Sequence, residues 1–246
     1  MTVTETATLF ATVNKMITEK SKLADVIASN PLLVSVLERM NVKLGFHEAT
    51  VEQICHRYKL SAHLFTNICN IFSSSEFEPQ VDLLTAKDLE HLVNYLKVSH
   101  KYYSKKIFKS LHLKIHKLLE GKDPNNQKIL NKFYDDYQAE LMHHFNFEEE
   151  TVFPYLLSLI KGKSDGNTAF KVMQFTENHS GIEDKLADLR NIILKYLPEE
   201  YSQSLRFDIL KDIISIESDL TKHTIIESKI LVPIMIRLEK QNNRVR

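Results

Sequence analysis

The chain of 246 residues carries 32 basic and 32 acidic side chains, and 43% of its residues are hydrophobic. This length allows one large domain or a medium and a small one, and the apolar share is enough for a buried core. The zero formal net charge argues against a protein that binds nucleic acid or an anionic membrane mainly by electrostatic attraction. Because Gly and Pro are rare and helix formers abound, the composition predicts an all-α protein.

The two cysteines, Cys55 and Cys69, are too few to build a thiolate metal cluster, and one short-range disulfide would stabilise a chain of this size poorly. We therefore expect reduced thiols in a cytoplasmic protein. The first ten residues lack the charged and apolar regions of a signal peptide. No stretch approaches the ~20 apolar residues of a membrane span, so no membrane partner is expected.

Residues 1–75 are predicted to form a small helical N-terminal domain of several short helices. Thr50, followed three residues later by Gln53, has the capping-box pattern of a helix start. Ser61 is expected to cap the next helix, and Asn30, which precedes a proline, is expected to cap an earlier one.

A polar, proline-containing stretch predicts a linker over residues 76–84, and residues 85–240 are predicted to form an up-down four-helix bundle. Four amphipathic stretches, at about 85–120, 125–161, 166–197 and 199–240, place residues on one helix face at three-and-four spacing. Their predicted inward positions are Leu89, Leu92, Leu96, His100, Tyr103, Ile107 and Leu111; Leu130, Tyr134, Tyr137, Leu141, His144, Glu148 and Thr151; Val172, Phe175, His179, Ile182, Leu186, Leu189 and Ile193; and Ile213, Ile216, Leu220, His223, Glu227 and Ile230.

Each inward stripe contains a histidine where an apolar residue is expected. Two of these histidines, His144 and His223, are followed four residues later by Glu148 and Glu227. Residues four apart on a helix lie on one face, so one helix can offer an imidazole and a carboxylate to the same ion.

The same pattern occurs twice, 79 residues apart. His100, His144, Glu148 and Pro154 recur as His179, His223, Glu227 and Pro233. The bundle is therefore expected to contain two copies of a helical hairpin, each of which contributes two histidines and one glutamate to a shared centre.

The residue types of this set indicate a metal site. A single histidine on an apolar face is more often a core or rim residue than a ligand. Two carboxylates and four imidazoles are different, because burying them without a cation would be costly. Imidazole and carboxylate suit iron better than the thiolate sets of structural zinc, and manganese could bind the same donors. Two bridging glutamates would leave at least one coordination position open for a diatomic ligand.

Residues 85–240 resemble the hemerythrin-like domain of the repair-of-iron-centres family, bacterial di-iron proteins of nitrosative and oxidative stress. The matching segments are Tyr95-Leu-Lys-Val-Ser-His100, His144-Phe-Asn-Phe-Glu148 with Val152-Phe153-Pro154, Glu177-Asn-His179, and His223-Thr-Ile-Ile-Glu227 with Val232-Pro233. The resemblance implies two non-haem iron ions with His100, His144, His179 and His223 as terminal ligands. It further implies that Glu148 and Glu227 bridge the two ions.

Glu140 lies one turn before His144, where the family has an acid beside the ligands. The resemblance implies the same role here, and a solvated glutamate is an equally good interpretation.

Residues 22–70 resemble the family's small N-terminal domain, with one departure. The family has two adjacent cysteines in the loop before Thr50, whereas residues 41–47 contain none. This departure leaves no thiol for a step in that loop. Residues 50–73 also have the pattern of a helix-turn-helix, but Ala62–Phe72 contains no Arg or Lys, so nucleic-acid binding is not expected.

Three functions follow as hypotheses. The first is a stress protein that reacts with nitric oxide, with possible reductase-type activity, or supplies iron to damaged iron–sulfur proteins. The second is a binding protein that carries or senses dioxygen or nitric oxide. The third is a transcription regulator that uses the N-terminal hairpin. The resemblance also allows a homodimer formed through the small domain.

Overall fold

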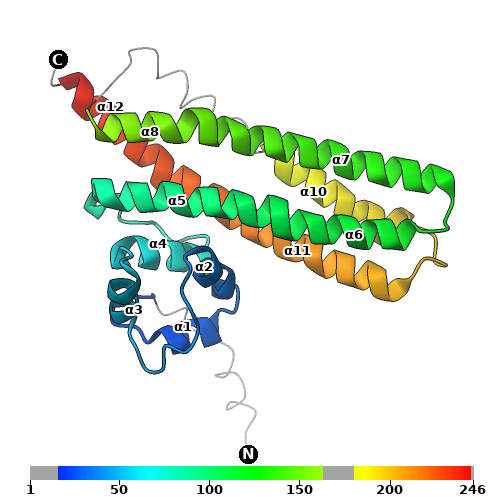
Figure 1. The fold of residues 1–246 in the computed structure, drawn as a ribbon, viewed down its shortest axis with the longest axis horizontal. Coiled ribbons are helices and arrows are strands. Elements are labelled where there is room, and N and C mark those ends of the chain that lie inside the picture. The colour runs from blue at the N-terminus through cyan, green and yellow to red at the C-terminus, as the bar shows by residue number, and fades with distance from the viewer. Residues whose placement is uncertain (1–15, 163–179, 245–246) are drawn as a thin grey trace, which may run out of the picture. The chain divides into compact units, whose positions relative to one another are not determined.

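The computed structural model describes residues 16–162 and 180–244, in which helices are the regular secondary structure and no strand is found. The predicted all-α fold class is confirmed. The chain divides into two compact units, the first ending at Leu83 and the second beginning at Leu84 (Figure 1).

The N-terminal unit contains four short helices, α1 (Leu23–Ser29), α2 (Leu33–Arg39), α3 (Val51–Tyr58) and α4 (Ala62–Ser73), followed by a 3-10 turn at Val81–Leu83. The predicted capping box at α3 is confirmed, because the Thr50 hydroxyl accepts the Gln53 N–H and the Gln53 side chain accepts the Thr50 N–H. The Ser61 hydroxyl accepts the Leu64 N–H and caps α4 in the same way.

The start of α2 differs from the prediction at Asn30. The side chain of Asn30 does accept a hydrogen bond, from the Leu32 N–H at 3.2 Å. Residues 31 and 32 nevertheless form a turn, and the regular helix begins only at Leu33. The local capping contact forms as predicted, but the helix starts two residues later than its proline suggested.

Four helical rods form the part of the second unit that the structure describes. The first joins α5 (Ala86–Tyr102) to α6 (Phe108–Leu119), the second joins α7 (Pro124–Phe147) to α8 (Phe153–Ile160), the third is α10 (Ser180–Asn191), and the fourth joins α11 (Gln203–Ile226) to α12 (Val232–Arg244). Helix α6 packs against α7, α7 against α10, α10 against α11, and α11 against α6. This closed ring, visible in Figure 1, is the expected up-down four-helix bundle.

Local sequence explains where the rods begin and end. The Thr85 hydroxyl accepts the Asp88 N–H to cap α5, and the Asp88 carboxylate accepts the Thr85 N–H in return. Between α6 and α7, Gly121 adopts a φ of 68°, which suits a residue without a Cβ and ends the first rod. Asp123 then caps α7, whose first residue is Pro124.

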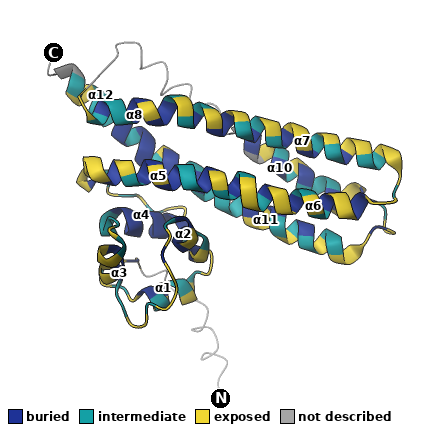
Figure 2. Ribbon diagram, in the orientation of Figure 1, coloured by how far each residue is buried: buried dark blue, intermediate teal, exposed yellow. Residues whose placement is uncertain are grey.

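An apolar core runs along the inside of the bundle, and Figure 2 shows its buried residues in dark blue. Leu111, Leu189 and Ile213, from three different rods, are fully buried in it. The hydroxyl of the buried Tyr134 donates to the Phe108 carbonyl, so a tyrosine sits in the core without an unsatisfied hydroxyl.

The inward stripes are confirmed in the described residues except at Ile107 and Thr151, which are only half-buried. Both lie in π-helical turns, Tyr103–Ile107 and Glu148–Val152, in which a backbone N–H bonds to the fifth residue before it. Each such turn holds one extra residue and moves the inward face one position along. Phe108 and Val152 are therefore buried in place of their predicted neighbours.

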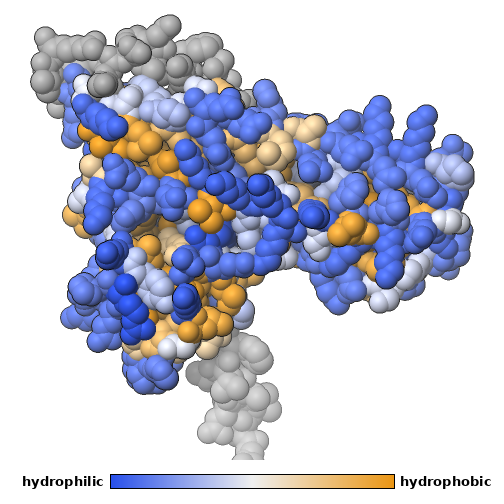
Figure 3. Space-filling view, viewed as in Figure 1, coloured by the Kyte–Doolittle hydropathy of each residue, from blue (hydrophilic) through white to orange (hydrophobic). Residues whose placement is uncertain are grey.

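No helix within residues 16–162 or 180–244 is both long and apolar enough to span a membrane. In the face drawn in Figure 3, hydrophilic side chains cover much of the bundle end formed by α6 and the first half of α7.

Leu111 and Leu113 provide a matched test of the core, because both lie on α6 and their exposures are 0% and 61%. Leu111→Ala should lower the free energy of unfolding by about 2–5 kcal/mol, since it leaves a cavity in a packed core. Leu113→Ala should change it by less than about 0.5 kcal/mol. Chemical unfolding of the full chain, followed by circular dichroism, measures both values. Equal effects of the two substitutions would contradict the placement of the core.

Candidate metal centre

Four buried side chains from three rods bring ligand-type atoms together inside the bundle. His100 comes from α5, Glu148 from the π turn after α7, and His223 and Glu227 from the junction after α11. One nitrogen or oxygen atom of each lies within 4.8 Å of those of the other three. Both carboxylates have no exposed surface.

The histidines turn their Nε2 atoms toward the carboxylates. His100 Nε2 lies 3.0 Å from Glu148 Oε2, and His144 Nε2 lies 3.0 Å from Glu148 Oε1. His223 Nε2 lies 2.9 Å from Glu227 Oε1 and 3.3 Å from His100 Nε2. The His100 and His223 contacts link the two predicted halves of the centre.

The backbone at each glutamate repeats as the sequence repeats. A π-helical turn begins at Glu148 and another begins at Glu227, and the Phe153 and Val232 N–H groups bond to their carbonyls. Pro154 and Pro233 follow one residue later. A proline inside a helix has no N–H and crowds the carbonyl four residues earlier, and a wider turn accommodates it. The wide turns thus place both carboxylates inside the bundle.

The donor set fits a cation. Two carboxylates without solvent contact are costly to bury unless positive charge compensates them. Two ligand atoms at right angles, each about 2.1 Å from an ion, lie about 3.0 Å from each other. The imidazole–carboxylate separations of 2.9–3.0 Å match that value. An ion would also relieve the 3.3 Å contact between the two imidazole nitrogens, because both nitrogens could give their lone pairs to it.

The remaining predicted residues differ in what the structure says about them. His144 is 8% exposed and reaches the cluster through Glu148. His179 lies outside the described residues, so its role as a ligand stays a prediction. Glu140 is half-buried and forms an ion pair with Lys185 of α10. Its carboxylate is not among the atoms gathered within 4.8 Å.

Sequence reasoning missed one residue that contacts a predicted ligand. Glu149 Oε1 lies 2.9 Å from His100 Nδ1, the ring nitrogen that faces away from the cluster. The ring of His100 also stacks on Phe145, with centroids 4.0 Å apart and planes at 10°. Nothing in the spacing of Glu149 distinguishes it from a solvated glutamate, since it contacts His100 across 49 residues of sequence.

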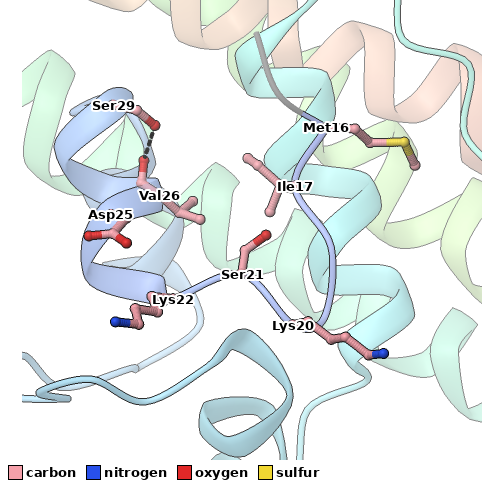
Figure 4. A pocket seen from close by; sticks show the side chains of 8 residues that line it. All are labelled: Met16, Ile17, Lys20, Ser21, Lys22, Asp25, Val26 and Ser29. Carbon is pink, nitrogen blue, oxygen red and sulfur yellow. Dashed lines mark hydrogen bonds between the residues drawn. The ribbon is translucent and has the colours of Figure 1, made fainter.

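A surface pocket in the N-terminal unit lies between residues 16–22 and helix α1 (Figure 4). Its charged side chains include Lys20, Lys22 and Asp25, and Lys22 already pairs with Glu48 at 2.8 Å. Apart from Asp25, its lining contains no histidine, cysteine or carboxylate, and one carboxylate beside two lysines does not make a transition-metal site.

Residues 91–233 of the chain match the hemerythrin HHE cation binding domain. The chain belongs to this family. The matched segment thus includes part of each of the four rods and every predicted ligand.

Two curated relatives extend the likeness beyond the HHE domain. The iron-sulfur cluster repair protein ScdA of Staphylococcus haemolyticus is 21% identical over 221 residues, which is 88% of this chain and 98% of the relative. The ScdA protein of a Staphylococcus epidermidis strain is 20% identical over the same shares. The resemblance to the repair-of-iron-centres family is confirmed.

The N-terminal unit has no exposed thiol among the residues that the structure describes. Loop residues 41–47 contain no cysteine, and Lys43 N–H in this loop donates to the Tyr58 hydroxyl. Cys55 and Cys69 are buried free thiols in α3 and α4. Burial raises the pKa of Cys55 from 9.0 to about 12, with a smaller contribution from Glu19, and burial likewise raises the pKa of Cys69.

These raised pKa values predict slow thiol chemistry in the folded protein. A rise in pKa from 9.0 to about 12 lowers the thiolate fraction at pH 8 roughly a thousandfold. A disulfide reagent at pH 8 should therefore label neither cysteine quickly, and should label both at once in denaturant. Absorbance of the released thiol measures both reactions. Rapid labelling of the folded chain would contradict the buried placement.

Glu148 and Glu227 are expected to be required for metal binding. Glu148→Gln and Glu227→Gln should weaken binding by more than the roughly 10–100-fold effect typical of residues that only orient a ligand. Glu150→Gln, an exposed substitution in the same turn as Glu148, is the control and should bind as the wild type does. Metal analysis after desalting measures the difference.

The same variants should also differ in how much added metal stabilises the folded protein. A metal ion at 100 times its dissociation constant should stabilise the wild type and Glu150→Gln by about 2.7 kcal/mol. Glu148→Gln should show no such increase, although its circular dichroism without metal should remain helical. A metal-dependent rise in the melting temperature of Glu148→Gln would argue against the assigned ligand.

Proposed function

We propose that the HHE domain binds two iron ions and that the protein supplies iron for the repair of damaged iron–sulfur clusters. The observation that supports this most directly is the buried His–Glu cluster, which is built of donors suited to iron. A second support is that curated relatives aligned over 88% of the chain are named as iron–sulfur cluster repair proteins.

The proposal of two ions rests on the number and type of donors. Glu148 and Glu227 each have two carboxylate oxygens, so each can contact two ions at once. With His179 as the remaining proposed ligand, four histidines and two glutamates would serve both ions. Manganese accepts the same donors, so the occupant must be measured.

Each proposed residue has a distinct task. Glu148 and Glu227 would each bind both ions. Each of the four histidines would bind one ion as a terminal ligand. The bound ions would supply redox chemistry and an open position for a small diatomic molecule, for which nitric oxide and dioxygen are the proposed ligands. Phe145 and Phe153 stack beside His100 and exclude water from its ring.

Imidazole and carboxylate ligands are compatible with a protein that both binds iron and releases it. Imidazoles and carboxylates must be deprotonated to bind an ion, so affinity depends on the surroundings of each ligand. A protein that supplies iron must hold it against loss to solvent and still yield it to a damaged iron–sulfur protein. That recipient is the proposed partner.

The test uses the full chain loaded with ferrous iron under anaerobic conditions and then desalted. It is mixed with a [4Fe–4S] enzyme that hydrogen peroxide has inactivated, and the enzyme's activity is followed. Dithiothreitol is present in every sample, because rebuilding the oxidised cluster needs an electron as well as ferrous iron. The wild type and Glu150→Gln should restore activity, whereas the Glu148→Gln, Glu227→Gln double variant should not. Free ferrous iron at the same total concentration gives the baseline. Recovery no better than this baseline would refute the proposed function.

A further inference from the structure

His100 is held at both of its ring nitrogens. Its Nε2 faces Glu148 and His223, while its Nδ1 lies 2.9 Å from Glu149 Oε1. An imidazole that gives the Nε2 lone pair to a cation carries its proton on Nδ1. The Nδ1–H of His100 would then donate to the Glu149 carboxylate, whose side chain is 32% exposed.

The rod that supplies Glu148 also fixes the plane of this ring. Phe145 of α7 stacks on the imidazole at 4.0 Å, and Phe153 of α8 lies nearly parallel to it at 5.8 Å. Glu149 lies between them in the π-helical turn. One segment of nine residues thus provides a ligand to the cluster and three contacts that orient a ligand from another rod.

The second half of the repeat keeps the ligands but not these supports. At the positions 79 residues later, Phe145, Glu149 and Phe153 are replaced by Thr224, Ser228 and Val232. Ser228 is exposed, and its hydroxyl donates to the Ile225 carbonyl. This half therefore has no carboxylate at the position of Glu149 and no aromatic ring at the positions of the two phenylalanines.

We propose that Glu149 is a positioning residue for His100 and that it makes the two metal positions unequal. A carboxylate on the far nitrogen of a ligating imidazole fixes the ring and increases its basicity, and losing it typically costs about 10–100-fold in metal affinity. The ion bound by His100 is accordingly retained, and the other ion is released first. This inference rests on the proposed metal centre, and it identifies which ion is the cargo.

The experiment compares full-length wild type, Glu149→Gln, Glu149→Asp and Glu150→Gln, each loaded with ferrous iron. A colorimetric iron chelator is added in excess, and release is followed over time. Glu150→Gln removes the same charge from the exposed neighbouring residue, so it controls for net charge. Thermal melting of the metal-free proteins shows whether any substitution disturbs the fold.

The wild type and Glu150→Gln should release iron in two phases of equal amplitude, one fast and one slow. In Glu149→Gln the slow phase should become about 10–100-fold faster while the fast phase stays unchanged. Glu149→Asp should recover part of the slow release, since it restores the charge; a merely structural residue would not show this recovery.

Three results would overturn the proposal in distinguishable ways. Two bound ions that leave the wild type in a single phase would refute the inequality. A Glu149→Gln variant that behaves as Glu150→Gln does would refute the role of Glu149. A wild-type chain that binds no iron would refute the metal centre, and with it both this inference and the proposed function. Normal biphasic release without cluster repair would refute the proposed function alone.

Discussion

The burial of two carboxylates inside an apolar bundle is the constraint on which the rest of the second unit depends. Glu148 and Glu227 have no exposed surface, and an uncompensated buried charge costs several kcal/mol. The chain meets this cost locally by placing a histidine four residues before each glutamate, and through the fold by bringing His100 from a third rod. The helices must therefore pack in one register, because a shift of either rod would separate a carboxylate from its partners.

This polar layer divides the core into two apolar parts. Along the first rod Leu96 precedes His100 and Leu111 follows it, and both leucines are fully buried. Along the fourth rod Leu220 precedes the ligands and Ile230 follows them. The ligand layer is thus closed at both ends by hydrocarbon. That closure explains how the imidazoles can face one another at 3.3 Å with almost no solvent exposure.

Most of the bundle could be predicted because its patterns are local. Three-and-four spacing gives the helices, and the capping contacts of Thr50 and Thr85 involve residues only three positions apart. The change of face from Ile107 to Phe108 could not be predicted from a regular helical period. It depends on a backbone N–H that bonds to the carbonyl five residues earlier and not to the one four residues earlier. Pro154 and Pro233 are the visible sign of such turns at the glutamates, but Tyr103–Ile107 has no proline.

In the candidate site, contacts within one helix could be predicted from the sequence and contacts between rods could not. The intrahelical pairs follow from spacing, whereas the partners of Glu149 and Glu140 are set by which rods are neighbours. Glu149 contacts His100 of another rod, and Glu140 pairs with Lys185. Each glutamate lies in the same kind of sequence surroundings, one rich in polar residues and close to a ligand. Only the tertiary arrangement separates a carboxylate beside an imidazole from one beside a lysine. The place of His179 in the centre and the residue boundaries of the predicted domains and linker stay predictions.

A repeated set of proposed ligands without repeated supports agrees with the proposed function, in which the protein releases iron. Two positions with the same ligands and the same surroundings would bind both ions with equal strength. Here the proposed ligands recur after 79 residues, while the aromatic rings and the extra carboxylate beside His100 do not. Much of the apolar core, including Leu111, Leu189 and Ile213, lies outside the ligand layer. The bundle would therefore keep most of its packing if one of the proposed ions left, because these core residues are not part of the ligand cluster.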